Sequence, residues 1–336
     1  MSDTETLSLT DIEDLAFAAL VAAGTSEANA RPLAVATART EADGVASHGL
    51  AYIPIYAEHV GCGKVDGQAV PVIDLARPGM LVADAGTGFP HAAIEKGFAQ
   101  LVPMAKAQGI AALAIRDSYN CGVLGLHTTR LAEAGLMGIG FTNAPASIAP
   151  SGGQKPVVGT NPISVAAPDG LGGVAVLIDQ SASVIAKSEI MKHAREGREI
   201  PLGWGLDADG QPTTDPDAAL AGSMAPAGGY KGVGLSLIVE MMAAAMTGAT
   251  LGKDASPFSG TKGGPPRTGQ FFIAIDPDAS SGGEYAARIA ALTGAVHGQD
   301  GARLPGDGRG AARMRAASAG VAVNAATLAK VRALLV

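Results

Sequence analysis

The 336-residue chain has few of the residues that mark secreted or nucleic-acid-binding proteins. Its two cysteines, Cys62 and Cys121, are too few for a disulfide framework and suit a reducing cytoplasm. Aromatic residues make up only 4% of the chain, and no block of lysines and arginines offsets the net charge of −7. Because bases would find few stacking platforms and phosphates no basic patch, we expect no nucleic-acid partner.

Long apolar runs are absent too, and we expect no signal peptide. The longest apolar stretch, 235–249, contains Glu240 and falls short of the roughly 20 residues that a membrane span needs. The first residues, "MSDTETLSLTDIEDL", are acidic and lack the basic start and apolar core of a signal peptide. We therefore expect a cytoplasmic protein with no membrane segment.

The residues that are abundant predict an α/β fold. Hydrophobic residues make up 47% of the chain and glycine contributes 46 residues, which suits helices packed on sheets and joined by tight turns. The length allows two domains. We expect a helical N-terminal part (1–78), an α/β core (79–290) and a C-terminal segment (291–336) that packs back on the N-terminal part.

Periodicity and turn residues place the elements more closely. The pattern Thr10-Asp11-Ile12-Glu13 predicts a capped helix over 10–23, and Ser26 caps a second helix that ends at Ala42. Further helices are predicted over 90–109, 125–135, 183–197, 232–249 and 283–298. Strands are predicted over 80–86, 110–118, 137–144, 163–168, 173–180 and 269–277. Two stretches, 206–220 and 252–269, read as flexible connections.

The first strand-to-helix turn of this βαβ pattern is where a Rossmann fold carries its dinucleotide fingerprint. Here Gly86 and Gly88 are followed by His91 in place of the third glycine, so an ordinary tight turn explains the pattern equally well. The stretch 228–234, "GGYKGVG", is no Walker A loop because its lysine comes too early, although its backbone N–H groups could still face a phosphate.

No metal site is expected. The spacings of His59, Cys62, Cys121 and His127 match no common zinc site. The stretch 207–211 begins like a calcium loop but lacks the closing glutamate.

One histidine differs from the other five. His59, His193 and His297 lie in charged helical patterns that are typical of solvated side chains. His48 instead follows Ser47 in the stretch "ADGVASHG", where two glycines break the chain between helices. A histidine held there can face a cleft and give up a proton near neutral pH.

Five stretches occur in the order found in a known family: "DGVASHGL", "GTNPISVAAP", "IDQSASVIAKSEI", "GWGLDADGQPTTDP" and "ARLPGD". In these the chain resembles the type-2 malate/L-lactate dehydrogenase family of nicotinamide-dependent oxidoreductases, over about residues 10 to 310. The stretches "NCGVLG", "NAPASIAPSGG" and "GQFFIAIDP" are most similar to the branch that reduces the cyclic imino acids Δ1-piperideine-2-carboxylate and Δ1-pyrroline-2-carboxylate with NADPH. The resemblance implies a nicotinamide-binding fold other than Rossmann, with a mixed sheet, and a homodimer.

The resemblance also assigns residues to roles. It implies His48 as proton donor, with Ser47 and Glu189 as its relay partners, and places Thr160 against the substrate. Implied contacts to the cofactor, NADPH or alternatively NADH, are Asn120, Cys121, Gly122, Val123, Leu124, Ile178, Asp179, Gln180, Gly229, Tyr230, Arg303, Leu304, Pro305, Gly306, Asp307, Gly308 and Arg309.

The chain departs from the family pattern at two places. Most members have an arginine four residues after the histidine, where it clamps the substrate carboxylate, but here that position is Tyr52. A phenol donates one hydrogen bond and cannot form a bidentate ion pair, so either another cation such as Lys187 serves or the substrate differs. The stretch before Cys121 reads Ser118-Tyr119-Asn120 without the histidines found in other branches, which favours His48 as the acid.

Three functions remain open at this point. The leading hypothesis is an NADPH-dependent reductase of a cyclic 2-imino acid that forms L-pipecolate or L-proline. A second is a 2-hydroxy acid dehydrogenase acting on malate, lactate or a similar acid. The third is a nucleotide-binding scaffold that has lost activity.

Overall fold

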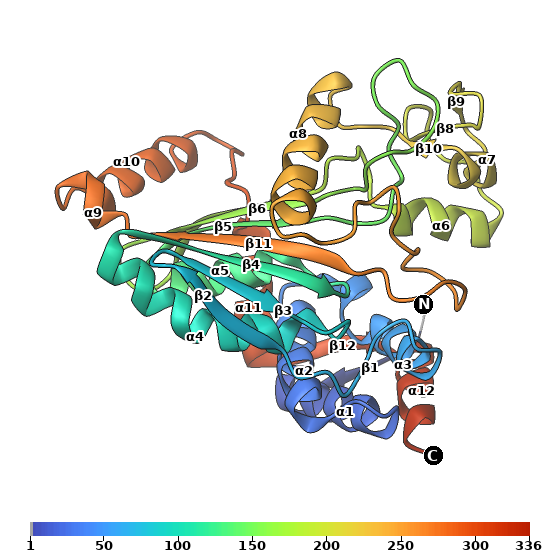
Figure 1. Cartoon of the computed structure of the whole chain (residues 1–336), viewed down its shortest axis with the longest axis horizontal. Helices are drawn as coiled ribbons and strands as arrows, with labels where there is room; N and C mark the ends of the chain where they lie inside the picture. The colour runs from blue at the N-terminus through green and yellow to red at the C-terminus, as the bar shows by residue number, and fades with distance from the viewer. Residues whose placement is uncertain (1–2) are drawn as a thin grey trace.

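The computed structural model describes residues 3–336, and the beginning of the chain forms a helical layer (Figure 1). Its helices are α1 (Leu9–Ala22), α2 (Glu27–Ala42) and α3 (Ile53–Gly61). Ser26 caps α2 as predicted. The capping box of α1 is formed by Ser8 and Asp11 rather than by Thr10 and Glu13, because the helix begins one residue earlier than predicted.

The end of the chain completes this layer. Strand β1 (Thr4–Leu7) pairs antiparallel with β12 (Val321–Asn324), and helix α12 (Ala325–Arg332) follows, ending in the turn η4 (Ala333–Leu335). Leu328 and Val331 of α12 are fully buried in one apolar cluster with residues of α1 and α2. In Figure 1 the red C-terminal helix accordingly lies beside the blue N-terminal ones.

A seven-stranded mixed sheet crosses the middle of the molecule (Figure 1). In spatial order its strands are β2 (Val72–Arg77), β3 (Met80–Asp84), β4 (Ile110–Ser118), β11 (Thr268–Ile275), β5 (Met137–Thr142), β6 (Ile163–Pro168) and β7 (Val174–Gln180). Only β3 and β4 pair in parallel, and every other neighbouring pair is antiparallel. Strand β11 separates β4 from β5. The alternation of strands and helices in the sequence therefore does not extend the parallel pairing beyond β3 and β4.

Helices cover both faces of this sheet. Below it in Figure 1 lie α4 (Pro90–Gln108), whose end is capped by left-handed Gly109, and α5 (Leu124–Glu133). Above it lie α8 (Tyr230–Glu240) and the π-helical turn η3 (Met241–Ala245), with Val239 and Ala243 buried against the sheet. The helix predicted over 232–249 reads from its apolar sequence as a buried helix, but Leu237, Ile238, Met241 and Met246 are exposed on its outer side.

A smaller α/β region lies beyond the sheet. It contains α6 (Lys187–Glu196), α7 (Pro216–Ala221) and a three-stranded sheet made of β10 (Ser223–Met224), β8 (Gly205–Leu206) and β9 (Pro212–Thr213). The stretch 206–220, predicted to be a flexible connection, is therefore structured, because Ala219 and its neighbours are buried in an apolar cluster with α6.

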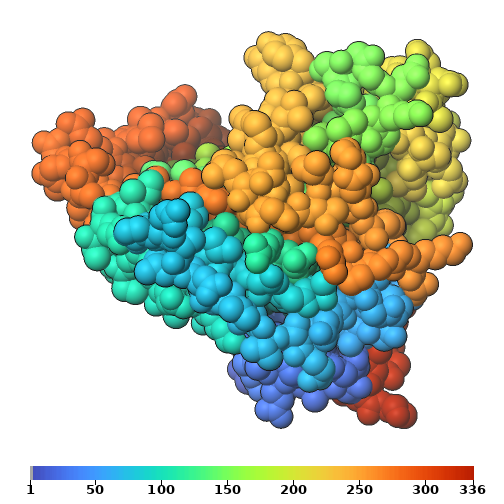
Figure 2. Space-filling model, in the orientation of Figure 1, coloured from blue at the N-terminus to red at the C-terminus, as the bar shows by residue number. Residues whose placement is uncertain are grey.

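Two helices after β11 project from the molecule. These are α9 (Asp278–Ser281) and α10 (Tyr285–His297), which form the orange knob at the left of Figure 2. Neither has a buried residue. The boundary predicted at residue 291 falls inside α10, and helix α11 (Asp307–Ala319) then returns the chain to the helical layer at α2.

Candidate active site

The Ser47-His48 pair stands in a break between α2 and α3, as predicted. Left-handed Gly44 ends α2, and two short helical turns follow, η1 (Ala46–His48) and η2 (Leu50–Tyr52). Ser47 Oγ lies 3.0 Å from His48 Nδ1, so the two side chains share a hydrogen bond. Ser47 is exposed and His48 is half-buried, which leaves the ring within reach of a ligand.

A buried carboxyl that the sequence analysis missed supports this break. Glu41, near the end of α2, is 5% exposed, and its Oε1 accepts a hydrogen bond of 2.7 Å from the Leu50 N–H. Burial raises the pKa of Glu41. The helical spacing of α2 hides such a contact, because it shows that position 41 faces inward but not what it meets.

Gly49 is expected to be irreplaceable at this contact. A Cβ there would lie 2.1 Å from Glu41 Oε1, so Gly49→Ala must displace the buried carboxyl from the Leu50 N–H. We expect the substitution to lower the free energy of unfolding by about 1–3 kcal/mol, measured by urea denaturation. Gly61→Ala, whose new Cβ meets nothing within 4 Å, is the matched control and should be neutral. Equal effects of the two substitutions would contradict the support role of Glu41.

Tyr52 packs directly against His48. The rings are stacked with centroids 5.8 Å apart and planes at 6°. Burial raises the pKa of Tyr52, while a hydrogen bond with the Asn120 side chain acts in the opposite direction, and the net shift is upward. The phenol is therefore neutral and can donate a hydrogen bond near the histidine. For His48 itself burial lowers the pKa, and the negative charge of Asp179 partly offsets that shift.

Residues 120–124 form a tight loop that leads into α5. Gly122 is left-handed, at φ +67°, and its N–H donates to Asn120 Oδ1 at 2.6 Å. Cys121 is buried, and burial raises the pKa of its thiol to about 12. This thiol is thus protonated at neutral pH and is no nucleophile.

The end of β7 meets the start of α11 beside this loop. Asp179 Oδ2 lies 2.8 Å from Arg309 Nη1, and the two side chains are only 11% and 22% exposed. Gly125 of α5 makes room for the pair, because a Cβ there would lie 2.6 Å from the carboxylate. Asp307 instead faces its own loop and accepts from the Leu304 N–H at 2.7 Å. The predicted arginine-rich loop 303–309 is thus partly helical, since α11 begins at Asp307.

A second group of predicted residues lies around a cavity of about 510 Å³, whose lining includes Gln180, Ser183, Ala186 and Lys231. Thr160 adjoins this region, since its carbonyl accepts a hydrogen bond of 2.7 Å from the Ala182 N–H. Gly229 and Tyr230 open α8 at the same place, next to Lys231. Asp179 and Gln180, at the end of β7, therefore connect the two groups of site residues.

Glu189 is not brought to His48. It lies in the first turn of α6, and no hydrogen bond or ion pair within residues 3–336 joins it to Ser47 or His48. The carboxylate whose charge acts on His48 is Asp179. The relay role of Glu189 stays a prediction.

One histidine prediction is wrong. His59 was expected to be solvated, yet its side chain is fully buried. Its Nδ1 is hydrogen-bonded to the Tyr119 hydroxyl, and its Nε2 lies 3.1 Å from the Gly260 carbonyl oxygen, so it fastens the 252–269 connection to α3. Over residues 3–336, no three His, Cys, Asp or Glu side chains stand together in a way that could hold a metal ion.

The meeting point of α5, β7 and α11 fits an anionic group. Arg309 Nη1 is paired with Asp179 Oδ2 as an ion pair but makes no well-aligned hydrogen bond within residues 3–336, so N–H groups of this guanidinium remain for a ligand. Both α5 and α11 begin there without a side chain capping their first N–H groups. Free N–H groups at helix starts and a guanidinium are what phosphate groups bind.

A family model described as malate/L-lactate dehydrogenase matches residues 7–332. The chain belongs to this family. The resemblance inferred from its ordered motifs is therefore confirmed. The (2R)-3-sulfolactate dehydrogenase (NADP(+)) of Chromohalobacter salexigens, a relative, is 42% identical over 91% of this chain and 91% of its own.

Other relatives match nearly the full length of the chain. The Delta(1)-pyrroline-2-carboxylate reductase of Ancylobacter novellus is 40% identical over 99% of this chain and 98% of its own. The crystal structure of delta1-piperideine-2-carboxylate reductase from Pseudomonas syringae is 36% identical and superposes with a TM-score of 0.93, covering 98% of this chain and 100% of that one. Within the described residues of the family member, no helix is long and apolar enough to cross a membrane.

Proposed function

We propose that the protein is an NADPH-dependent reductase of cyclic 2-imino acids, which converts Δ1-pyrroline-2-carboxylate to L-proline and Δ1-piperideine-2-carboxylate to L-pipecolate. The observation that carries the proposal is the position of His48. Its titratable ring is hydrogen-bonded to Ser47, and the negative charge of Asp179 acts to raise its pKa. Full-length similarity to reductases with these names supports the substrate class.

The chemistry requires a proton donor where His48 stands. A reduced nicotinamide supplies the hydride that the imine carbon accepts. Electron density then develops on the ring nitrogen, and protonated His48 delivers a proton to that nitrogen. Ser47 holds the imidazole through Nδ1, so the other ring nitrogen, Nε2, faces the substrate. Asp179 favours the charged form of the imidazole. Glu189 is the relay partner that the family resemblance implies.

The cofactor is proposed to lie along the meeting point of α5, β7 and α11. Backbone N–H groups of 123–125 and the Arg309 guanidinium would hold its phosphates, and Arg303 would add a second cation. Ile178, Gln180, Gly229 and Tyr230 would line the path toward the substrate. This arrangement on a mixed sheet is a nicotinamide-binding fold other than Rossmann.

Tyr52 and Thr160 are the proposed substrate contacts. The phenol is neutral and donates a single hydrogen bond to the carboxylate, in place of the arginine that the family usually has. Lys187 opens α6 immediately after Ala186 of the cavity wall. Its charge would complete the recognition of the carboxylate.

A 2-hydroxy acid dehydrogenase is the second candidate, and the sulfolactate dehydrogenase at 42% identity favours it. Steady-state rates with NADPH and each of Δ1-pyrroline-2-carboxylate, Δ1-piperideine-2-carboxylate, pyruvate, oxaloacetate and 3-sulfopyruvate separate the two. Turnover of the cyclic imines above the oxo acids is expected. Turnover of the oxo acids alone would refute the imine reductase, and NADPH binding without any turnover would indicate a scaffold that has lost activity.

The pH dependence should follow the ionisation of His48. Because protonated His48 is the donor, the reductive kcat must fall as pH rises through its pKa, which burial lowers and Asp179 raises. Asp179→Asn removes the raising effect, so the falling limb should move to lower pH at saturating cofactor. Rate–pH profiles of the wild type and of Asp179→Asn test this. A limb that stays in place or moves to higher pH would contradict the pairing of Asp179 with His48.

We also propose that the protein is a cytoplasmic homodimer. The exposed apolar side chains on the outer side of α8 and η3, which are Leu237, Ile238, Met241 and Met246, support an interface there. Both cysteines are free thiols, which suits a reducing compartment. Light scattering on the purified chain, with Ile238→Lys as the disrupting variant, tests the dimer.

A further inference from the structure

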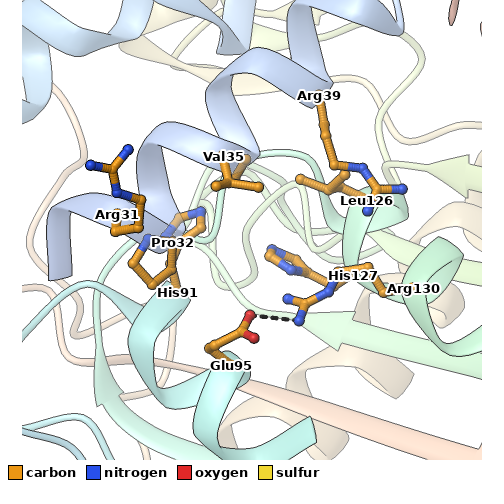
Figure 3. Close-up of a pocket in the computed structure, with 10 residues that line it drawn as sticks. Arg31, Pro32, Val35, Arg39, His91, Glu95, Leu126, His127 and Arg130 are labelled. Carbon is orange, nitrogen blue, oxygen red and sulfur yellow. Dashed lines mark hydrogen bonds and ion pairs between the residues drawn. The ribbon is translucent and has the colours of Figure 1, made fainter. Parts of the chain in front are cut away.

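Two buried histidines lie between the cofactor loop and a cavity of about 370 Å³ enclosed by α2, α4 and α5 (Figure 3). His91 of α4 is 3% exposed and His127 of α5 is 2% exposed, and their ring centroids are 5.5 Å apart. Figure 3 shows both rings lining the cavity below Val35, with the Glu95–Arg130 ion pair on one side. The proposed reaction uses neither histidine.

His127 touches the cofactor loop through its Nε2, which lies 2.9 Å from the carbonyl oxygen of Cys121 in a buried hydrogen bond. Burial lowers the pKa of His127 to about 4, so the ring is neutral at the pH of the cell. Because a carbonyl only accepts, the single ring proton must sit on Nε2. The other nitrogen, Nδ1, has no hydrogen-bond partner within residues 3–336.

This contact holds one half of a peptide unit whose other half is also held. The Cys121 carbonyl and the Gly122 N–H belong to the same planar peptide. His127 fixes the carbonyl at 2.9 Å, and Asn120 Oδ1 fixes the N–H at 2.6 Å. Rotation of this plane would break both hydrogen bonds, and Gly122 on its far side is left-handed at φ +67°.

The orientation of this peptide sets the direction of the N–H groups that follow. Val123 and Leu124 lead into α5 without any side-chain cap, so their directions depend on the backbone before them. Without His127, the buried carbonyl oxygen of Cys121 would have no hydrogen-bond donor. The loop would then rotate this carbonyl toward another donor. If the Cys121–Gly122 peptide rotated, the Asn120 side chain would move as well. It would then lose its hydrogen bond with the Tyr52 phenol, which packs beside His48.

We propose that His127 is a positioning residue that fixes the Cys121–Gly122 peptide and thereby the cofactor-binding shape of the loop. The proposal rests on the cofactor assignment of the proposed function. His91 has no such role, since none of its atoms is hydrogen-bonded to the loop although its Nε2 faces Gly122.

The first experiment compares His127→Phe with His91→Phe by fluorescence titration of NADPH in the absence of any imine. His127→Phe keeps a ring in place but has no N–H donor, so the Kd for NADPH should rise about tenfold. His91→Phe is the matched control in the same cavity and should leave the Kd unchanged. An unchanged Kd in His127→Phe, or an equal rise in both variants, would overturn the proposal.

The second experiment restores the donor. The side-chain amide of His127→Gln can reach the same carbonyl, and its Kd should return close to that of the wild type. Imidazole added to His127→Ala has access through the cavity of Figure 3 and should restore binding in a saturable way. A role in packing alone would already be preserved by the ring of His127→Phe, which has no donor. If His127→Gln, and His127→Ala with added imidazole, bind NADPH as weakly as His127→Phe does, loss of the hydrogen bond is not the cause of the weaker binding.

The third experiment needs no variant and no cofactor. Long-range proton–nitrogen correlation spectra of the wild-type chain should show His127 as a neutral ring protonated on Nε2 from weakly acidic to neutral pH. A ring protonated on Nδ1, or charged, would overturn the proposal. Wild-type protein that binds no NADPH would instead refute the proposed function, and leave this spectrum as the test of His127.

Discussion

Replacing His48 by alanine is expected to lower kcat for imine reduction by about 10²–10⁴-fold, which is the usual contribution of a positioned general acid. The affinity for NADPH should stay unchanged, because the predicted phosphate contacts lie on α5 and α11 and not on His48. Pre-steady-state and steady-state rates measure the first effect, and fluorescence titration of NADPH measures the second. Loss of turnover with intact cofactor binding is the signature of a proton donor.

The control for this variant is His193→Ala, which removes a histidine of α6 whose Nδ1 is 2.6 Å from the Glu199 carbonyl oxygen. Its kcat should equal that of the wild type. The donor assignment fails if His48→Ala turns over normally. It also fails if weakened NADPH binding accounts for the whole loss.

Replacing Arg309 by alanine is expected to weaken NADPH binding by about 10- to 100-fold. A charge-assisted hydrogen bond contributes about 1.5–3 kcal/mol, and each 1.4 kcal/mol is about a factor of ten in Kd. The substitution also leaves Asp179, only 11% exposed, as an unpaired negative charge where phosphates are proposed to bind. Calorimetric titration with NADPH and with NADH measures the effect.

The double variant Asp179→Asn/Arg309→Ala should recover part of the lost affinity, because it removes the repelling charge as well. Arg315→Ala, on the exposed side of the same helix, is the matched control and should bind normally. A greater loss for NADPH than for NADH would place Arg309 at the 2′-phosphate, and an equal loss would place it at the pyrophosphate. Normal NADPH affinity in Arg309→Ala would remove Arg309 from the site.

Local signals in the sequence predicted most of the elements. Ser26 accepts from a backbone N–H that lies within one turn, and Gly109 adopts the left-handed conformation that ends α4. Both effects act over a few residues and are visible in a short window. The Ser47-His48 break was predictable for the same reason, since Gly44 and Gly49 interrupt the helical pattern on either side of it.

Contacts between distant parts of the chain were not predictable in this way. Strand β11 enters the sheet between β4 and β5 from about 130 residues further along, and no local pattern shows that position. Periodicity indicated that Glu41 and His59 lie on helices but not that each is buried with a specific partner. Asp179 was assigned to the cofactor from the resemblance, whereas its charge also acts from β7 on His48, which lies in the break between α2 and α3.

The pairing of β1 with β12 sets the order in which the protein can become active during synthesis. Helices α1 and α2 are made first, yet the apolar core in which they pack includes Leu328 and Val331. While the ribosome is still adding the central sheet, that part of the core is missing, and the break that carries His48 lacks Arg313 of α11, which is hydrogen-bonded to Asp43. Catalytic competence should therefore arise only after the last helix has left the exit tunnel. A chain lacking α12 would leave the apolar side of α1 exposed.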